Sequence, residues 1–294
     1  MKIGISIPFD YFAVVPQSKT ALILHQKIGN YRCFLEKLHD SEVNFIELRG
    51  VIYNTPDYII KNICQELWEK GFSLSIHTDL PEKVIDEDSN LNFTFLKKII
   101  GQINNFQEKL ILVIHSYSKK SCNYYDLLEK SARNISLIAK IIETEKLPIN
   151  FAIELTRGAI ETTPGTTYDS LLQLNDKINS EKIGFCWDFG HAYSNMLKNT
   201  IPLTPPQAFT SKVVHTHIHG VDKNDTTHCP LNETNLPLGD YMEPLIKNHY
   251  NGIYNLEINP EQLPETNALD IYIENANKIK EILKIFKTKK KRII

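Results

Sequence analysis

The segment KIGFCWDFGHAYSN, Lys182–Asn195, shows the local pattern that decides the fold. It opens with a short apolar run typical of a buried strand and passes directly into a strand-to-helix turn. In that turn, Asp188 and His191 stand three residues apart, so both side chains can face one cavity. Apolar runs of this kind recur along the chain, separated by longer stretches with helical periodicity. The sequence therefore predicts a series of βα units.

Eight short runs rich in Ile, Val and Phe are candidate strands: Lys2–Ile7, Asn44–Leu48, Ser73–His77, Lys109–His115, Ile149–Glu154, Lys182–Asp188, Lys212–His217 and Ile253–Glu257. Amphipathic stretches between them, such as Tyr58–Lys70, Leu127–Lys146 and Ala268–Lys287, predict crossover helices. The segment Thr200–Thr210 is expected to be a loop. Because each strand precedes a helix and no glycine-rich dinucleotide fingerprint follows any of them, we expect an α/β fold, the closed (β/α)₈ TIM barrel.

The composition indicates a soluble globular protein. Hydrophobic residues make up 42% and charged residues 23% of the 294 residues, and no linker divides them, so we expect one domain over 1–294. A formal net charge of -2 provides no overall basic field for a polyanion. The five cysteines are far apart, which favours a reducing compartment. No leader or long apolar segment is visible, so we expect a cytoplasmic protein without membrane contact.

The predicted strands from the second to the eighth all end at or near an acid or an imidazole: Glu47, His77, His115, Glu154, Asp188, His217 and Glu257. Active sites of TIM barrels are built at this face. One histidine at a strand end is more often a packed residue than a ligand, but seven such residues together predict a metal site. Imidazole and carboxylate ligands suit Zn, Mn, Fe or Co, and the sequence does not choose among them.

The stretch HTHIHGVDKNDTTH around the seventh strand adds further candidates. His217 is the expected ligand, whereas the deeper His215 is more often a core residue and His219, beyond the strand, could touch substrate. The following loop returns Asp225 and His228 toward the barrel mouth. Two cations, Arg157 and Lys223, are candidate substrate contacts, although each is more often a surface charge.

Several stretches taken in order resemble the xylose isomerase-like TIM barrel superfamily: SIHTDLP, VIHSYS, FAIELTRG, CWDFGHAYSN, VVHTHIHGVD and NLEINP. This superfamily includes sugar-phosphate isomerases and epimerases and the endonuclease IV enzymes, AP endonuclease family 2. By resemblance to the sugar branch, one divalent metal is held by Glu154, Asp188, His217 and Glu257. His191 and His77 would contact the substrate. Glu154 and Glu257 would exchange the proton next to a sugar carbonyl through an enediolate.

The resemblance to endonuclease IV implies a different site, in which three zinc ions cleave a phosphodiester of DNA. Its ligands would include His77, His115 and Glu154 in one group, and His191, Asp225 and His228 in another. However, Asp225 lies three residues before His228 where that branch has a spacing of two. The stretch TDLPEK after His77 also lacks the bulky residues that enter the DNA helix. The sequence therefore favours a metal-dependent sugar or sugar-phosphate isomerase or epimerase, with a multi-zinc phosphodiesterase as the alternative, and the resemblance makes a homodimer plausible.

Overall fold

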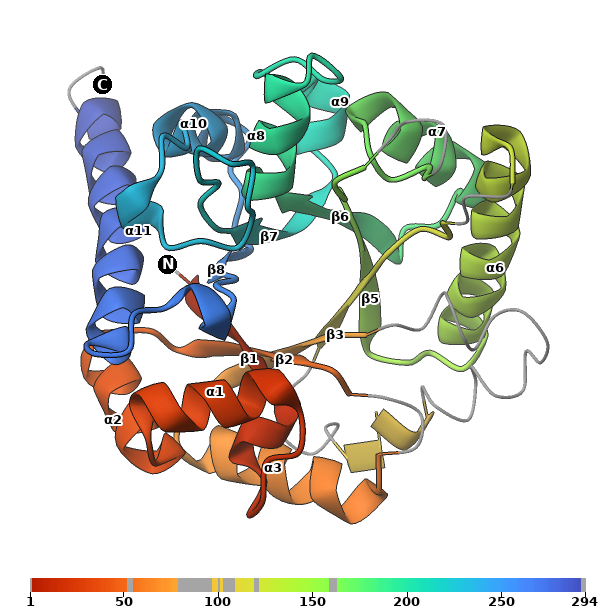
Figure 1. Cartoon of the computed structure of the whole chain (residues 1–294). Coiled ribbons are helices and arrows are strands. Elements are labelled where there is room, and N and C mark those ends of the chain that lie inside the picture. The colour runs from red at the N-terminus through yellow and green to blue at the C-terminus, as the bar shows by residue number, and fades with distance from the viewer. Residues whose placement is uncertain are drawn as a thin grey trace.

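Eight parallel strands form a closed barrel in chain order, β1 to β8, as Figure 1 shows with helices arranged around it. The structure is a computed structural model that describes residues 2–51, 55–78, 97–99, 101–102, 109–118, 122–158 and 163–291. The strands are β1 (Lys2–Pro8), β2 (Phe45–Arg49), β3 (Ser73–His77), β4 (Leu110–Ile114), β5 (Ile149–Glu154), β6 (Ile183–Asp188), β7 (Val213–Ile218) and β8 (Ile253–Leu256). The pairing of β1 with β8 closes the ring, which confirms the predicted fold class.

The described helices follow the strands and cover the outside of the barrel (Figure 1). They are α1 (Lys19–Ile28), α2 (Tyr31–Asp40), α3 (Asp57–Glu69), α6 (Tyr124–Thr144), α7 (Tyr168–Ile178), α8 (Phe189–Leu197), α9 (Gln207–Thr210), α10 (Leu238–Lys247) and α11 (Ala268–Lys291). Short 3₁₀ turns occur at Phe9–Phe12, Leu231–Glu233 and Pro260–Gln262.

Side chains alternate between the two faces of each strand, as a parallel sheet requires. On β1, Ile3, Ile5 and Ile7 belong to the large core between barrel and helices, whereas Ser6 reaches inward to Glu47 of β2. A second, small apolar cluster of Val113, Ala152 and Cys186 joins neighbouring strands β4, β5 and β6. The barrel interior is therefore apolar beside these three strands and polar beside β1 and β2.

Aromatic side chains fill the space between the barrel and the helices on the β6 side. Trp187 is fully buried, and its ring packs edge-on against Tyr168, Phe209 and Tyr241. Since Trp187 and Asp188 are adjacent on β6, burial of the indole outside the barrel turns the carboxylate of Asp188 inward. Core packing on one face of the strand thus orients a polar residue on the other.

All eight predicted strands are present, with ends that differ by at most one residue. The strand β2 runs to Arg49, one residue beyond the predicted end, so Arg49 and not Glu47 stands at the barrel mouth. The helix α6 begins at Tyr124 because the side chain of Asn123 accepts a hydrogen bond from the backbone of Asp126 and caps it. The expectation of a loop over Thr200–Thr210 was wrong at its end, where Gln207–Thr210 forms the short helix α9 after Pro206.

Candidate functional site

Four acids and imidazoles meet at the carboxyl ends of four consecutive strands. Glu154 ends β5, Asp188 ends β6, His217 lies near the end of β7, and Glu257 directly follows β8. One potential ligand atom from each lies within 4.8 Å of all the others, and all four residues are buried. We call these residues the four-residue group. They are the set that the resemblance to sugar epimerases implied.

The contact between His217 and Glu257 indicates what this group can hold. Nδ1 of His217 and Oε2 of Glu257 lie 2.9 Å apart, so the two atoms pair when the imidazole is protonated. When the imidazole is neutral with its proton on Nε2, both atoms lack a hydrogen-bond partner among the described residues, and leaving buried polar atoms unpaired costs free energy. Three carboxylates and one imidazole converging on one point suit a divalent cation, which would satisfy both atoms. The residues therefore fit the metal that the sequence predicted.

The hydrogen bonds around Asp188 fix the position of its carboxylate. One oxygen, Oδ1, accepts the backbone N–H of His191 over 2.7 Å, so Asp188 is also the N-cap of α8. The second oxygen, Oδ2, lies 3.8 Å from Nδ1 of His217. The start of the helix thus holds this acid in place before any ligand binds.

Burial and the neighbouring charges oppose each other at the acids of the group. Burial alone would raise the pKa of Glu154, but His115, His217 and His191 lower it well below its usual value. At Glu257 burial again opposes ionisation, while His217, His228 and Arg49 lower its pKa well below the usual range. The carboxylates are therefore ionised near neutral pH, and their combined charge favours a bound cation.

Two further histidines contact the same oxygen of Glu154. Nε2 of His77 lies 2.9 Å and Nε2 of His115 lies 3.0 Å from Oε2 of Glu154. Their rings pack edge to face with centroids 4.9 Å apart. Because these three side chains could also hold an ion together, Glu154 could belong to two sites.

A third set of possible ligands surrounds Asp188 and consists of His191, His219 and His228. His219 is fully buried, and its Nε2 lies 3.0 Å from Oδ1 of Asp188. Its ring stacks on His228 with centroids 4.1 Å apart. Gly190 makes room for it, because a Cβ at that position would overlap the ring of His219.

The loop after β7 positions His228 over His219. Gly220 and Cys229 exchange two backbone hydrogen bonds of 2.7 and 3.2 Å, which close the loop between them. The backbone N–H of His228 then donates to Nδ1 of His219 over 2.8 Å. Sequence reasoning considered His219 as a substrate contact and did not include it among the ligand candidates. The sequence carries no local signal for this position, because it depends on how Gly190 of α8 and the residue after β7 meet in space.

Asp225, predicted as a ligand of the same set, lies elsewhere. Its carboxylate is 3.0 Å from the Arg157 guanidinium and 2.6 Å from Nζ of Lys198, and it accepts a hydrogen bond from Ser194. No group of possible metal ligands within the described part of the chain includes it. Arg157 is therefore joined to Asp225, and the exposed Lys223 lines a small surface cavity of about 320 Å³ beside Asp225.

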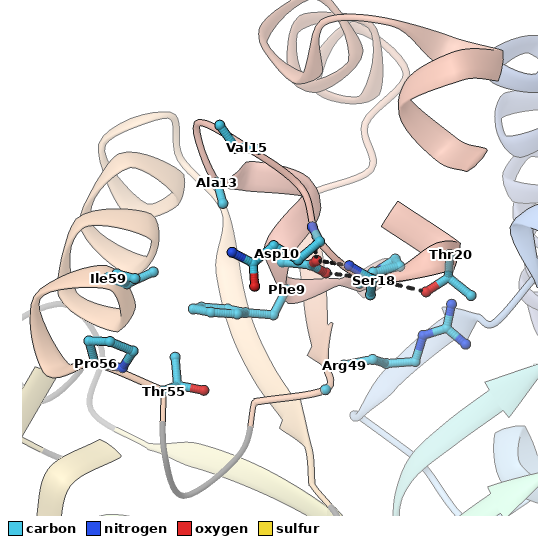
Figure 2. A pocket seen from close by; sticks show the side chains of 13 residues that line it. Phe9, Asp10, Ala13, Val15, Ser18, Thr20, Arg49, Thr55, Pro56 and Ile59 are labelled. Carbon is cyan, nitrogen blue, oxygen red and sulfur yellow. Dashed lines mark hydrogen bonds between the residues drawn. The ribbon is translucent and has the colours of Figure 1, made fainter. Parts of the chain in front are cut away.

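A larger cavity of about 580 Å³, shown in Figure 2, has none of the four-residue group in its lining. It lies between the turn after β1 and the start of α3, and Phe9, Asp10, Ser18, Thr20 and Arg49 are among its lining residues. Asp10 accepts hydrogen bonds from the backbone of Gln17 and from both the backbone and the hydroxyl of Ser18, so this acid shapes the wall.

Arg49 connects this cavity to the four-residue group. Its Nη1 lies 3.2 Å from Oε1 of Glu257, and its Nε is buried without a hydrogen-bond partner in the described structure. A ligand in the cavity would therefore lie next to a cation that already holds one of the two candidate catalytic acids.

The helices of the described structure include none that is both long enough and apolar enough to span a membrane. Residues 79–83 of the TDLPEK segment, used above to weigh the two branches of the superfamily, lie outside the described residues.

Comparison with known proteins gives one relative among curated sequences and many similar folds. The uncharacterized protein MJ1311 of Methanocaldococcus jannaschii is 28% identical over 162 residues, which cover 51% of this chain and 47% of that protein. The chain thus matches about half of the length of this relative.

The solved structures match over almost the whole chain at low identity. D-psicose 3-epimerase from Clostridium cellulolyticum H10, crystallised with D-tagatose, has a TM-score of 0.68 at 13% identity and covers 96% of this chain and 99% of its own. An L-ribulose 3-epimerase has a TM-score of 0.71 at 13% identity, with coverage of 100% and 98%. At such identities the similarity shows the shared fold. The family model of the xylose isomerase-like TIM barrel matches residues 35–288, and the chain therefore belongs to this family.

Proposed function

We propose that this protein is a divalent-metal-dependent sugar or sugar-phosphate isomerase or epimerase. The observation that carries the proposal is the convergence of Glu154, Asp188, His217 and Glu257 on one point at the barrel mouth. Support also comes from the structural neighbours that are sugar epimerases, D-psicose 3-epimerase and L-ribulose 3-epimerase. The cation could be Zn, Mn, Fe or Co.

A divalent cation held by these residues would polarise a carbonyl oxygen and an adjacent hydroxyl of an open-chain sugar and acidify the C–H of the carbon that bears this hydroxyl. The chain supplies two carboxylates for the proton. Glu154 comes from β5 and Glu257 from the end of β8, and their Oε2 atoms lie 3.5 and 2.9 Å from Nδ1 of His217. One acid can remove the proton while the other returns it to the opposite face, which inverts the carbon.

The side chains around these acids determine how they act. Arg49 holds Oε1 of Glu257, and His77 and His115 hold Oε2 of Glu154, so both carboxylates have fixed orientations. A carboxylate that is already held in one orientation loses less entropy when it reaches the reactive geometry. The cavity beside Arg49 has room for the remainder of the sugar, and its Ser18 and Thr20 hydroxyls could bond to sugar hydroxyls.

The test combines metal content with turnover. Purified protein is analysed for metal per chain, and a panel of ketoses, aldoses and their phosphates is screened for exchange of a carbon-bound hydrogen with deuterated water. One ion per chain that is lost in Glu154→Gln and kept in His115→Ala, together with exchange that falls about 100-fold or more in Glu257→Gln, is the expected result. The exposed His25 provides a matched control, because His25→Ala should leave both readouts unchanged.

A multi-zinc phosphodiesterase is a second candidate, favoured by one observation. Besides the four-residue group, His77, His115 and Glu154 form one further possible ligand set, and Asp188, His191, His219 and His228 form another. Two or three zinc ions per chain, of which some are lost in His115→Ala, would support this candidate. Cleavage of a duplex containing an abasic site would then be measured, and absence of cleavage with all ions bound would count against it.

A further inference from the structure

Beneath the four-residue group, the barrel interior contains a cluster of buried polar side chains with Glu47 at its centre. Glu47 is fully buried on β2, two residues below the mouth. Side chains from β1, β3, β7 and β8 contact its carboxylate: Ser6, Ser75, His215, His217 and Asn255. On the remaining side of the barrel, the cluster of Val113, Ala152 and Cys186 is apolar.

The carboxylate of Glu47 is surrounded by hydrogen-bond donors. Ser6 donates to Oε1 over 2.8 Å and Asn255 donates to the same oxygen over 3.3 Å. The other oxygen, Oε2, lies 2.8 Å from Nε2 of His215. Neither a lysine nor an arginine of the described chain pairs with it, so this buried charge is held by neutral donors and imidazoles.

Glu47 also determines which nitrogen of His217 faces the site. Nε2 of His217 lies 3.0 Å from Oε1 and 3.1 Å from Oε2 of Glu47, which places the ring proton on Nε2. The opposite nitrogen, Nδ1, faces Glu257 and Glu154. The ring therefore lies between a buried carboxylate on one side and the four-residue group on the other.

An apolar residue at position 47 could fill the barrel interior, as Val113, Ala152 and Cys186 do beside β4, β5 and β6. Burial of a charge is costly, and replacing buried ionic groups by apolar ones is often neutral or stabilising. Packing alone therefore does not explain why a carboxylate, and not an apolar side chain, occupies position 47. In metal sites, a carboxylate commonly accepts the second N–H of a ligating histidine, fixing its tautomer and increasing its basicity.

We propose that Glu47 is a positioning residue that keeps the proton of His217 on Nε2 and aims Nδ1 at the metal. This inference rests on the proposed metal site and adds a residue that contacts neither metal nor substrate. Glu47 acts through His217, because both of its carboxylate oxygens lie within 3.1 Å of Nε2 of that ring.

The first experiment measures the affinity of metal-free protein for Zn²⁺ and Mn²⁺ by calorimetry. Glu47→Gln keeps the volume but removes the charge, and we expect it to weaken binding about 10- to 100-fold while leaving the number of ions per chain unchanged. Ser6→Ala is the matched control, because it removes a donor to the same carboxylate without touching His217. Its affinity should stay within about threefold of wild type, since it leaves the imidazole bond intact.

The second experiment reports the tautomer directly and does not use Glu47→Gln, so it stands even if that variant fails to fold. In cadmium-loaded protein with isotope-labelled histidine, nitrogen NMR should show coupling of the metal to Nδ1 of His217 and a slowly exchanging proton on Nε2. Assignment uses His217→Gln. Coupling to Nε2, or unchanged affinity in a folded Glu47→Gln, would overturn the inference. If His217→Gln itself binds metal as wild type does, the proposed metal site fails instead.

Discussion

Arg49 donates a hydrogen bond from Nη1 to Oε1 of Glu257 over 3.2 Å, joining residues that stand 208 positions apart in the chain. The pair links the candidate catalytic acid to the wall of the 580 Å³ cavity. A positive charge beside a carboxylate lowers the pKa of the acid and fixes its orientation. The pair therefore gives the first of four predictions.

Replacing Arg49 by Met should slow turnover and shift its pH dependence. Without the guanidinium the pKa of Glu257 rises, so the acidic limb of kcat/KM moves to higher pH. The loss of a charged hydrogen bond should reduce kcat/KM by about 10- to 100-fold. In Arg49→Lys, which keeps the charge, the acidic limb of kcat/KM should stay at the same pH as in wild type. An Arg49→Met profile identical to that of wild type would show that the pair plays no part in the reaction.

Metal affinity should increase with pH because His217 must lose a proton to bind. Burial lowers the pKa of His217, while Cys186 and the glutamates Glu257, Glu47 and Glu154 raise it, with a net increase well above the usual value. Burial also keeps the Cys186 thiol protonated by raising its pKa well above normal, so we attribute the increase to the glutamates. Below the pKa of His217, the proton competes with the metal.

Calorimetry of metal binding in two buffers of different ionisation enthalpy measures this competition. We expect at least one proton to be released per ion at neutral pH, and weaker binding as the pH falls. Binding that is independent of pH between neutral and acidic conditions would mean that His217 is not protonated in the metal-free protein.

The stability of the metal-free protein should depend on His191. Burial lowers the pKa of His191, but Asp188 and Glu154 outweigh it and raise the pKa to about 9 from the usual 6.5. Because the folded state binds the proton more tightly than the unfolded chain, this stabilisation is complete below pH 6.5. It is lost as the pH rises through about 9.

Thermal unfolding in the presence of a chelator tests this dependence. The Tm of wild type should fall between neutral pH and pH 9, and the fall should be smaller in His191→Gln. If Tm falls with pH equally in wild type and in His191→Gln, the proton that stabilises the folded state is bound by a group other than His191.

Substitution of Gly190 tests the packing around His219. The Cβ of Gly190→Ala would overlap the imidazole of His219, which is buried against Asp188. Overpacking of this kind costs about 1–3 kcal/mol of unfolding free energy. Gly239, the second residue of α10, is the control, because no atom lies within 4 Å of an added Cβ there and Gly239→Ala should change the unfolding free energy by no more than about 0.5 kcal/mol. Denaturant unfolding measures both, and a neutral Gly190→Ala would show that His219 has room to move.

Local pattern was enough to predict the fold and to bring the acids and imidazoles at the strand ends to one face, whereas the selection of the four-residue group among them came from the family resemblance. The strands are short apolar runs with acids or imidazoles at their ends, and the geometry of a parallel barrel brings those ends to one face. Glu154, Asp188, His217 and Glu257 accordingly lie together, as the resemblance implied. To predict that such residues share one face, it is enough to know that each of them lies at the carboxyl end of a strand.

The details that depend on one residue of register or on loop geometry were not accessible in this way. The extension of β2 to Arg49 lowers Glu47 from the mouth into the barrel interior. The choice between Asp225 and His219 depended on the path of the loop after β7, where backbone pairing of Gly220 with Cys229 turns His228 back over His219. Asp225 instead meets Arg157 and Lys198, which are distant in sequence. Such long-range contacts have no local signature.

The four-residue group is drawn entirely from β5 to β8, whereas Glu47, Arg49, His77 and His115 come from β2 to β4 or directly follow them. The four candidate ligands thus lie in the C-terminal half of the barrel, and side chains of the N-terminal half contact three of them, Glu154, His217 and Glu257. An exchange of the first four βα units would leave all four candidate ligands on one inherited piece. If these residues hold a cation as proposed, changes in the N-terminal half would alter the surroundings of the ion without replacing a ligand.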